Sequence, residues 1–330
     1  MTSTRRNPIR STARRRLATP VGVLVGALVS ALALAACGGG SSDNPLDTTN
    51  TGGAQTPSTK AIIVGSANFP ESTLLAQIYI TALQAKNIQV KPKLNIGSRE
   101  AYLPALKDGS IDLIPEYTGN LLQYYDDKDT SKSPAAVYAA LSKAVPSGLT
   151  VLEQSKAQDS DAVVVTQQTA QQNKLTSIAD LKPVAGGMKL GGPGEWKTRK
   201  NTGVPALKSV YDVVFGQFIA LDAGGPLTKN ALKSGQVQAA NVFTTDTDIP
   251  KNNWVVLTDP KHMFAAQNIV PLISQSKVTD EVKSVLNEVS SKLDTQTLLA
   301  LNGQVANDKK DPSAVAKAWV TGGMEPVTTS

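Results

Sequence analysis

Apolar positions along the chain alternate between short runs typical of buried strands and longer stretches with helical spacing. Residues 61–65 form an apolar run that ends in Gly, as expected for a buried strand. A helix is predicted to begin at Pro70, because proline is accommodated in the first turn, and to end at Asn87. Residues 88–96 alternate as a strand does, and Pro92 indicates that this strand lies at a sheet edge. Alternation of strands and helices predicts parallel α/β layers.

The same alternation continues through the rest of the chain. The expected helices are 98–107, 118–125, 134–145, 204–211, 226–234, 279–292, 294–302 and 312–320, and the expected strands are 111–114, 161–165, 237–242 and 268–273. An apolar strand that returns near residue 268, followed only by helices, predicts that the chain crosses to a second lobe and comes back.

One short segment of the sequence occurs twice. Residues 105–111 (ALKDGSI) reappear as 231–237 (ALKSGQV), and the same offset of 126 residues carries the aromatic-Thr pair 117–118 onto 243–244. Each copy is typical of a helix end, a Gly that can adopt a left-handed conformation and a short strand. Ligands of open α/β sheets bind beyond the carboxyl ends of the strands. The repeat therefore predicts two similar lobes that present one ring each, unless so common a helix ending recurs by chance.

The N-terminal segment has the pattern of a secretion signal. Six arginines lie within residues 5–16, an uncharged run covers 17–36, and small residues precede Cys37. The sequence Leu-Ala-Ala-Cys is the lipobox pattern of bacterial lipoproteins, in which the cysteine becomes the lipidated first residue. We therefore expect residues 1–36 to be a lipoprotein signal peptide and Cys37 to carry the lipid. The alternative is an uncleaved membrane anchor, for which the run is near the lower length limit of ~17–25 residues.

Removal of the signal changes the charge of the protein. The whole chain has 33 basic and 27 acidic residues and a formal charge of +6. The six arginines leave with the signal, so 27 basic residues then face 27 acidic ones, and no basic excess indicates nucleic-acid binding. Residues 37–60 are rich in Gly, Ser, Thr, Asn and Pro, which is typical of a flexible tether. We expect a monomer, lipid-anchored at the outer face of the cytoplasmic membrane in a bacterial cell envelope.

Few residue types suited to catalysis are present. His262 is the only histidine and Cys37 the only cysteine, which excludes Cys/His dyads, Ser-His-Asp triads and zinc sites built from these residues. The glycine-rich loop 191–194 lacks the Lys-Ser/Thr of a phosphate loop. We therefore expect no cofactor, no metal and no enzymatic activity. A cell-envelope enzyme that uses cleft carboxylates remains an alternative, with Glu71, Glu116, Asp161 and Asp246 as candidates.

Four motifs spread over the chain carry a family resemblance. They are residues 64–71 (VGSANFPE), 95–100 (NIGSRE), 111–119 (IDLIPEYTG) and 243–246 (FTTD). Together they resemble the substrate-binding proteins of glycine betaine/choline/proline-type ABC importers, the osmoprotectant importers. The resemblance extends from about residue 62 to residue 319, and PEYTG is its most specific part.

The resemblance implies a two-lobed α/β fold of the type II periplasmic-binding-protein class. Each lobe would have a mixed, mostly parallel sheet flanked by helices, and two strands would form a hinge. Lobe one would comprise residues 61–161 and 268–330, and lobe two residues 162–267. A ligand would close the lobes, and the membrane permease subunits of the importer would accept the closed form. The family's ligands carry a quaternary ammonium held by aromatic rings through cation–π attraction.

Comparison with the family position by position implies an incomplete cage of rings. Tyr117 matches the first cage tyrosine, and Phe243 retains the ring of a second without its hydroxyl. Asp161 and Gln267 fall where a third and a fourth ring are expected. Ala67 replaces a lysine that would help to bind a ligand carboxylate.

The polar ligand-binding positions are also partly matched. Arg199 matches the carboxylate-binding arginine of the family, and Asn120 falls where the family can use threonine. The expected ligand-binding residues are Asn68, Tyr117, Thr118, Asn120, Asp161, Arg199, Phe243, Thr244 and Gln267. Other roles remain open: core rings for Tyr117 and Phe243, a solvated loop for Arg199, a hinge contact for Asp161 and a helix cap for Asn68.

The expected function is a solute-binding lipoprotein that captures a small osmoprotectant of the glycine betaine/choline class between its lobes and hands it to an ABC permease. One alternative keeps the receptor role but takes a neutral hydroxylated or aromatic small molecule, because the cage is incomplete. A structural or sensory lipoprotein with a ligandless cleft is a further alternative.

Overall fold

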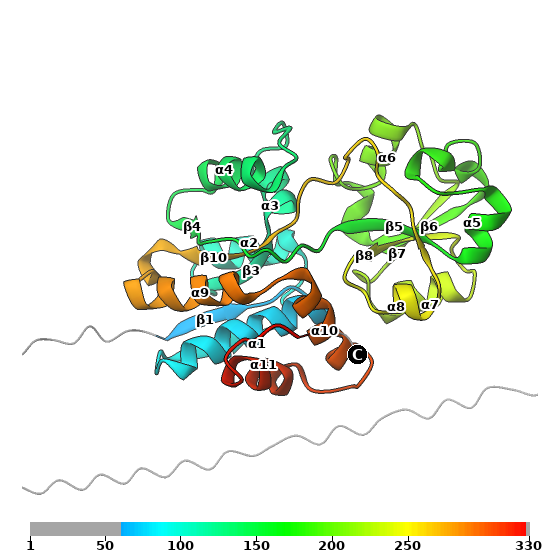
Figure 1. Cartoon of the computed structure of the whole chain (residues 1–330). Helices are drawn as coiled ribbons and strands as arrows, with labels where there is room; N and C mark the ends of the chain where they lie inside the picture. The colour runs from blue at the N-terminus through cyan, green and yellow to red at the C-terminus, as the bar shows by residue number, and fades with distance from the viewer. Residues whose placement is uncertain (1–60, 328–330) are drawn as a thin grey trace, which may run out of the picture. The chain divides into compact units, whose positions relative to one another are not determined.

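The computed structural model describes residues 61–327 and contains two five-stranded sheets, in the orders β2-β1-β3-β10-β4 and β7-β6-β8-β5-β9. We call the first sheet with its helices lobe one and the second lobe two; Figure 1 shows lobe one in blue to bluish green and again in orange to red, and lobe two in green to yellow. The predicted signal peptide, Cys37 and the predicted tether lie outside the described residues. Within 61–327, no helix is both long and apolar enough to cross a bilayer.

Lobe one contains the first and last parts of the described chain. Its strands are β1 (Ile62–Gly65), β2 (Val90–Lys93), β3 (Leu113–Tyr117), β4 (Leu149–Val151) and β10 (Ile269–Ser274). Its helices are α1 (Pro70–Ala85), α2 (Arg99–Lys107), α3 (Thr118–Tyr125), α4 (Pro134–Ala144), α9 (Asp280–Lys292), α10 (Thr295–Ala306) and α11 (Pro312–Thr321). β2 is shorter than predicted and lies at the sheet edge, as Pro92 indicated.

Lobe two is built from the middle of the chain. Its strands are β5 (Asp161–Val165), β6 (Lys189–Pro193), β7 (Gln217–Leu221), β8 (Ala239–Phe243) and β9 (Val255–Val256). Its helices are α5 (Gln167–Asn173), α6 (Val204–Tyr211), α7 (Pro226–Lys233) and α8 (Asp248–Lys251), with a 3₁₀ turn at Gly194–Lys197.

Both sheets are mixed, as predicted. β1 pairs in parallel with β2 and β3, and β6 pairs in parallel with β7 and β8. β10 and β5 run antiparallel to both of their neighbours. Parallel pairs therefore do not outnumber antiparallel ones, contrary to the expectation of mostly parallel sheets. The reason is that β5 and β10 follow the crossings between lobes, so they run away from the cleft while β3 and β8 run toward it.

The repeat in the sequence is a repeat in the structure. α2, Gly109 and β3 correspond to α7, Gly235 and β8, and the two strands start and end at positions 126 residues apart. Gly109 and Gly235 both have positive φ, +77° and +75°, which favours glycine at the end of each helix. Both strands are the third in their sheets, so Tyr117 and Phe243 occupy equivalent ends.

Two chain segments connect the lobes side by side, as the predicted hinge requires. Gln158 and Asn268 form an antiparallel bridge, and the Asp159 N–H donates to the Gln267 carbonyl at 3.1 Å. Asp161 was predicted to end lobe one, but it is the first residue of β5 and pairs with Phe243. It therefore belongs to the sheet of lobe two.

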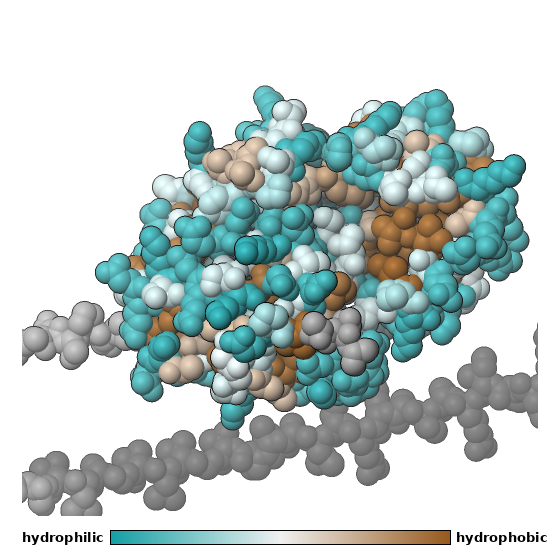
Figure 2. Space-filling view, viewed as in Figure 1, coloured by the Kyte–Doolittle hydropathy of each residue, from teal (hydrophilic) through white to brown (hydrophobic). Residues whose placement is uncertain are grey.

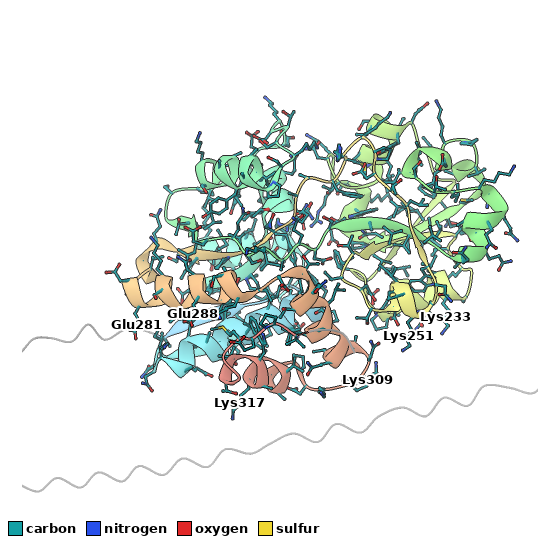
Figure 3. The ribbon with its side chains drawn as sticks, in the orientation of Figure 1. Lys233, Lys251, Glu281, Glu288, Lys309 and Lys317 are labelled. Atoms are coloured by element: carbon teal, nitrogen blue, oxygen red, sulfur yellow. The ribbon has the colours of Figure 1, made fainter. Side chains whose placement is uncertain are left out.

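Amphipathic helices cover the sheets of each lobe. α9, for example, buries Val282, Leu286 and Val289, while Glu281 and Glu288 point outward (Figure 3). The visible surface is mostly hydrophilic, with an apolar area over lobe two (Figure 2). The apolar stripes hold helices on sheets, and the sheets in turn fix the strand ends that face the cleft.

Candidate ligand-binding cleft

A cleft between the lobes encloses a cavity of about 50 Å³. A water occupies ~10–15 Å³ of such a cavity volume, so the cavity has room for roughly three to five waters. This space suits a small solute. The lining residues used below are Asn68, Phe69, Arg99, Tyr102, Tyr117 and Asn120 from lobe one, Asp159 from a crossing segment, and Asp161, Glu195, Arg199, Asn241 and Phe243 from lobe two.

Three aromatic rings meet in the cleft. The ring centroid of Phe69 lies 6.1 Å from that of Tyr117 and 5.1 Å from that of Phe243, with the planes tilted by 34° and 33°. Tyr117 and Phe243 therefore face one region from opposite lobes, as the repeat predicted, and Phe69 joins them. Phe69 was missed from the sequence although it lies in the segment NFPE that carries the family resemblance. Tyr102 adds a fourth aromatic side chain to the lining.

Phe69 is positioned by the start of α1. It occupies the N-cap position immediately before Pro70, with extended backbone and no side-chain cap. The helix therefore has no cap from Asn68, which is exposed and lines the cleft. Because proline favours the first turn, the helix start is fixed there and directs the preceding ring to the cleft.

Glu71 connects both lobes through one buried carboxylate. The Tyr117 hydroxyl donates to Glu71 Oε1 at 2.7 Å, and the Thr245 hydroxyl of lobe two donates to Oε2 at 2.5 Å. Asn302 Nδ2 of α10 also donates to Oε2 at 2.5 Å. Burial, with repulsion from Glu71 and other carboxylates, raises the pKa of Tyr117 well above its ordinary value. The phenol therefore stays protonated and keeps its ring in place by donating to Glu71.

Asp159 lies at the hinge beside Glu71. Its Oδ1 accepts from the Thr244 hydroxyl at 3.1 Å and from the Thr245 N–H at 3.0 Å, while Oδ2 has no hydrogen-bond partner among the described residues. Burial, with repulsion from Glu71, raises the pKa of Asp159 well above its ordinary value. The hinge therefore favours a protonated Asp159.

Asp161 holds one amide from each lobe. Its Oδ2 accepts from Asn120 Nδ2 of α3 at 2.8 Å, and its Oδ1 accepts from Asn241 Nδ2 of β8 at 2.9 Å. Asp161 is buried and lines the cleft, where it acts as a polar contact between the lobes.

The two arginines in the cleft lining both face carboxylates. Arg99 donates to Glu116 from Nε at 2.9 Å and from Nη2 at 2.7 Å, and the Tyr102 hydroxyl donates to Glu116 Oε1 at 2.7 Å. Burial opposes the charge of Arg99, but attraction by Glu116 outweighs it, so the pKa of Arg99 is raised. Since the pair is buried, its charges compensate each other at the cleft wall.

Arg199 connects the lobes at the mouth of the cleft. It donates to Glu100 of α2 from Nε and Nη2, both at 3.2 Å, and its Nη2 lies 3.8 Å from Glu195 Oε1. Burial alone would raise the pKa of Glu100, but hydrogen bonds from Arg199 and Ser98 outweigh it and lower that pKa to about 2. The arginine predicted to bind a ligand carboxylate is therefore already paired with protein carboxylates.

Three of the predicted ligand-binding residues do not line the cleft. The Thr118 hydroxyl donates to the Ala266 carbonyl, and the Thr244 hydroxyl donates to Asp159. Gln267 is fully buried and accepts from the Asn120 N–H at 2.9 Å. These residues fix the hinge and the start of α3 behind the cleft, so Gln267 does not stand in for a fourth ring.

The carboxylates considered for an enzyme do not form one group. Glu71 accepts three hydrogen bonds, from Tyr117, Thr245 and Asn302. Glu116 faces Arg99, Asp161 holds two amides, and Asp246 pairs with Lys229 at 3.2 Å. Among residues 61–327, no group of three or more His, Cys, Asp or Glu residues is arranged to hold a metal ion.

Comparison with known proteins agrees with this geometry. Residues 60–322 match the family described as the substrate-binding domain of ABC-type glycine betaine transport systems. The glycine betaine-binding protein YehZ of Escherichia coli K12 is 27% identical over 271 residues, covering 78% of this chain and 88% of YehZ. The carnitine transport binding protein OpuCC of Listeria monocytogenes is 26% identical over 265 residues, covering 78% of this chain and 85% of OpuCC.

Solved structures confirm the two-lobed fold. Apo YehZ from Escherichia coli, at 27% identity, has a TM-score of 0.56 and covers 80% of this chain and 99% of that one. A glycine betaine/carnitine/choline ABC transporter structure, at 22% identity, has a TM-score of 0.61 and covers 79% of this chain and 98% of that one.

Proposed function

Because the chain belongs to the family of substrate-binding domains of ABC-type glycine betaine transport systems, we propose that it captures a small quaternary ammonium solute in its cleft. The observation that carries this proposal is the meeting of Phe69, Tyr117 and Phe243. Each ring contributes about 0.5–2 kcal/mol to the binding of a cation. Asp161 was aligned with a position where a ring is expected, and Phe69 supplies a ring in the same cleft. The argument for a neutral ligand, which rested on the missing rings, is therefore weaker.

Both lobes contribute to the proposed site, which links binding to closure. Tyr117 belongs to β3 and Phe243 to β8, so a cation touches rings of both lobes only when they approach. Glu71, Asp161 and Arg199 then form hydrogen bonds between the lobes. We propose that this closed form is presented to the membrane permease of an ABC importer.

Calorimetry against glycine betaine, choline, carnitine, ectoine and proline tests the proposal. We expect binding of at least one solute with a quaternary ammonium, at one molecule per protein, with no turnover over hours. Tyr117→Ala and Phe243→Ala should each weaken that binding. Absence of heat with all five solutes would contradict the assignment, and consumption of a bound solute would favour an enzyme.

The cellular location is a separate part of the proposal. The lipobox before Cys37 supports a lipid anchor after removal of residues 1–36, with 37–60 as the tether to the outer face of the membrane. Cys37→Ser should move the protein from the membrane fraction to the soluble fraction, with binding unchanged. Continued membrane association of that variant would argue for another anchor. Light scattering should give the mass of a monomer.

A further inference from the structure

Asp161 fixes the orientation of two amides in the cleft. Carboxylate oxygens accept hydrogen bonds, so the amide groups of Asn120 and Asn241 turn their NH₂ ends toward Asp161. The contacts agree, with Nδ2 to carboxylate distances of 2.8 Å for Asn120 and 2.9 Å for Asn241. The carbonyl ends of both amides therefore face away from Asp161.

These two carbonyl oxygens lack partners in the protein. Asn120 Oδ1 and Asn241 Oδ1 are buried and have no hydrogen-bond donor among the described residues, although both side chains line the cleft. Asn241 is fully buried. Buried acceptors without donors are rare in native proteins because they lose hydration without compensation. A donor on the bound solute would supply the missing hydrogen bonds.

The acceptors lie next to the rings. Asn241 and Phe243 are two residues apart on β8, so their side chains are on the same face of the sheet at roughly 6–7 Å spacing. Asn120 follows Tyr117 by three residues, at the start of α3. A short solute can therefore place its cationic head against the rings and a second group against the amides.

We propose that this part of the cleft selects a cationic solute that also carries an O–H or N–H donor, and that Asp161 is the positioning residue that sets both acceptors. The inference rests on the proposed function and names the class of solute more closely. A fully methylated solute without a donor, such as glycine betaine, leaves both carbonyls unpaired. Its carboxylate would also lie beside the carboxyl group of Asp161, while Arg99 and Arg199 are engaged by protein carboxylates.

The test compares choline with (2-fluoroethyl)trimethylammonium, in which fluorine replaces the hydroxyl at similar size but cannot donate. Calorimetry with the wild-type protein should give roughly tenfold to hundredfold weaker binding of the fluoro compound, because a site built for a donor rejects an analogue that lacks it. Equal affinity for the two would overturn the donor requirement and leave the quaternary ammonium function intact. Binding of neither compound would overturn this inference, whereas the proposed function falls only if none of the five solutes named above binds.

Variants separate a hydrogen-bond effect from a steric one. Asn241→Ala and Asp161→Asn should both bring the choline-to-fluorocholine affinity ratio toward one, because they remove an acceptor or free the amides to turn. Asn287→Ala is the matched control, since Asn287 accepts from the Glu153 N–H and does not line the cleft. Both cleft variants should first be shown by circular dichroism to be folded. A choline-to-fluorocholine affinity ratio that is unchanged in both would also overturn the inference, because a purely structural role of Asn241 and Asp161 predicts that result.

Discussion

Replacing Phe69 with leucine tests the role of the ring that the sequence did not single out. Leucine keeps an apolar side chain before α1 but removes the π face that lies 5.1 Å from Phe243 and 6.1 Å from Tyr117. One ring is worth about 0.5–2 kcal/mol to a bound cation, which corresponds to roughly 2- to 30-fold in Kd. We therefore expect Phe69→Leu to weaken binding of choline by that factor.

The assay should separate charge recognition from loss of packing. Calorimetry with choline and with 3,3-dimethylbutan-1-ol, its neutral carbon analogue, gives the preference for the cation, and Phe69→Leu should reduce it. The control is Phe264→Leu, because Phe264 stacks on Trp196 at 6.3 Å in lobe two and does not line the cleft. A cation preference that is unchanged in Phe69→Leu, or reduced equally in the control, would refute the three-ring site.

Three further predictions concern Asp159 at the hinge, the contact of Arg199 between the lobes, and Gly109 in the repeated segment. Burial, with repulsion from Glu71, raises the pKa of Asp159, so the folded state holds a proton that the unfolded chain releases. The stabilising contribution of this proton is fully present below about pH 3.8 and is lost as pH rises through the raised pKa. The melting temperature of the wild-type protein should therefore fall between about pH 4 and about pH 8, and Asp159→Asn should remove this fall. Arg199→Ala should weaken the binding of choline and of glycine betaine equally, by less than about fivefold, because its partner Glu100 is nearly half exposed. A larger loss confined to glycine betaine in parallel titrations would show that Arg199 binds the ligand instead. Gly109→Ala should lower the free energy of unfolding in urea by about 1 kcal/mol, because the φ of Gly109 is +77°. Gly186→Ala is the control and should cost less, since Gly186 has open space around it and no positive φ. Equal losses would contradict the explanation by positive φ.

The repeated segment allowed much of the fold and part of the site to be predicted. It located the two third strands and their terminal rings, because a helix end, a left-handed glycine and a buried strand are all local features. The partner of Arg199 could not be predicted this way. It lies on α2, about a hundred residues earlier in the chain, and meets Arg199 only when the lobes approach.

Phe69 and Gln267 show why the remaining site residues were harder to predict. Asn68 was expected to bind the ligand or to cap the helix, and its neighbour Phe69 carries no polar pattern, so only the packing of α1 against the cleft reveals the ring. Gln267 matched a cage position, but the hydrogen bonds of the crossing segments turn it behind α3.

The most direct test is the affinity of the wild-type protein for choline relative to 3,3-dimethylbutan-1-ol, measured by calorimetry at one salt concentration. Three rings at about 0.5–2 kcal/mol each predict that the cation binds at least tenfold more tightly than its neutral analogue. Equal affinities would contradict recognition of a quaternary ammonium by Phe69, Tyr117 and Phe243.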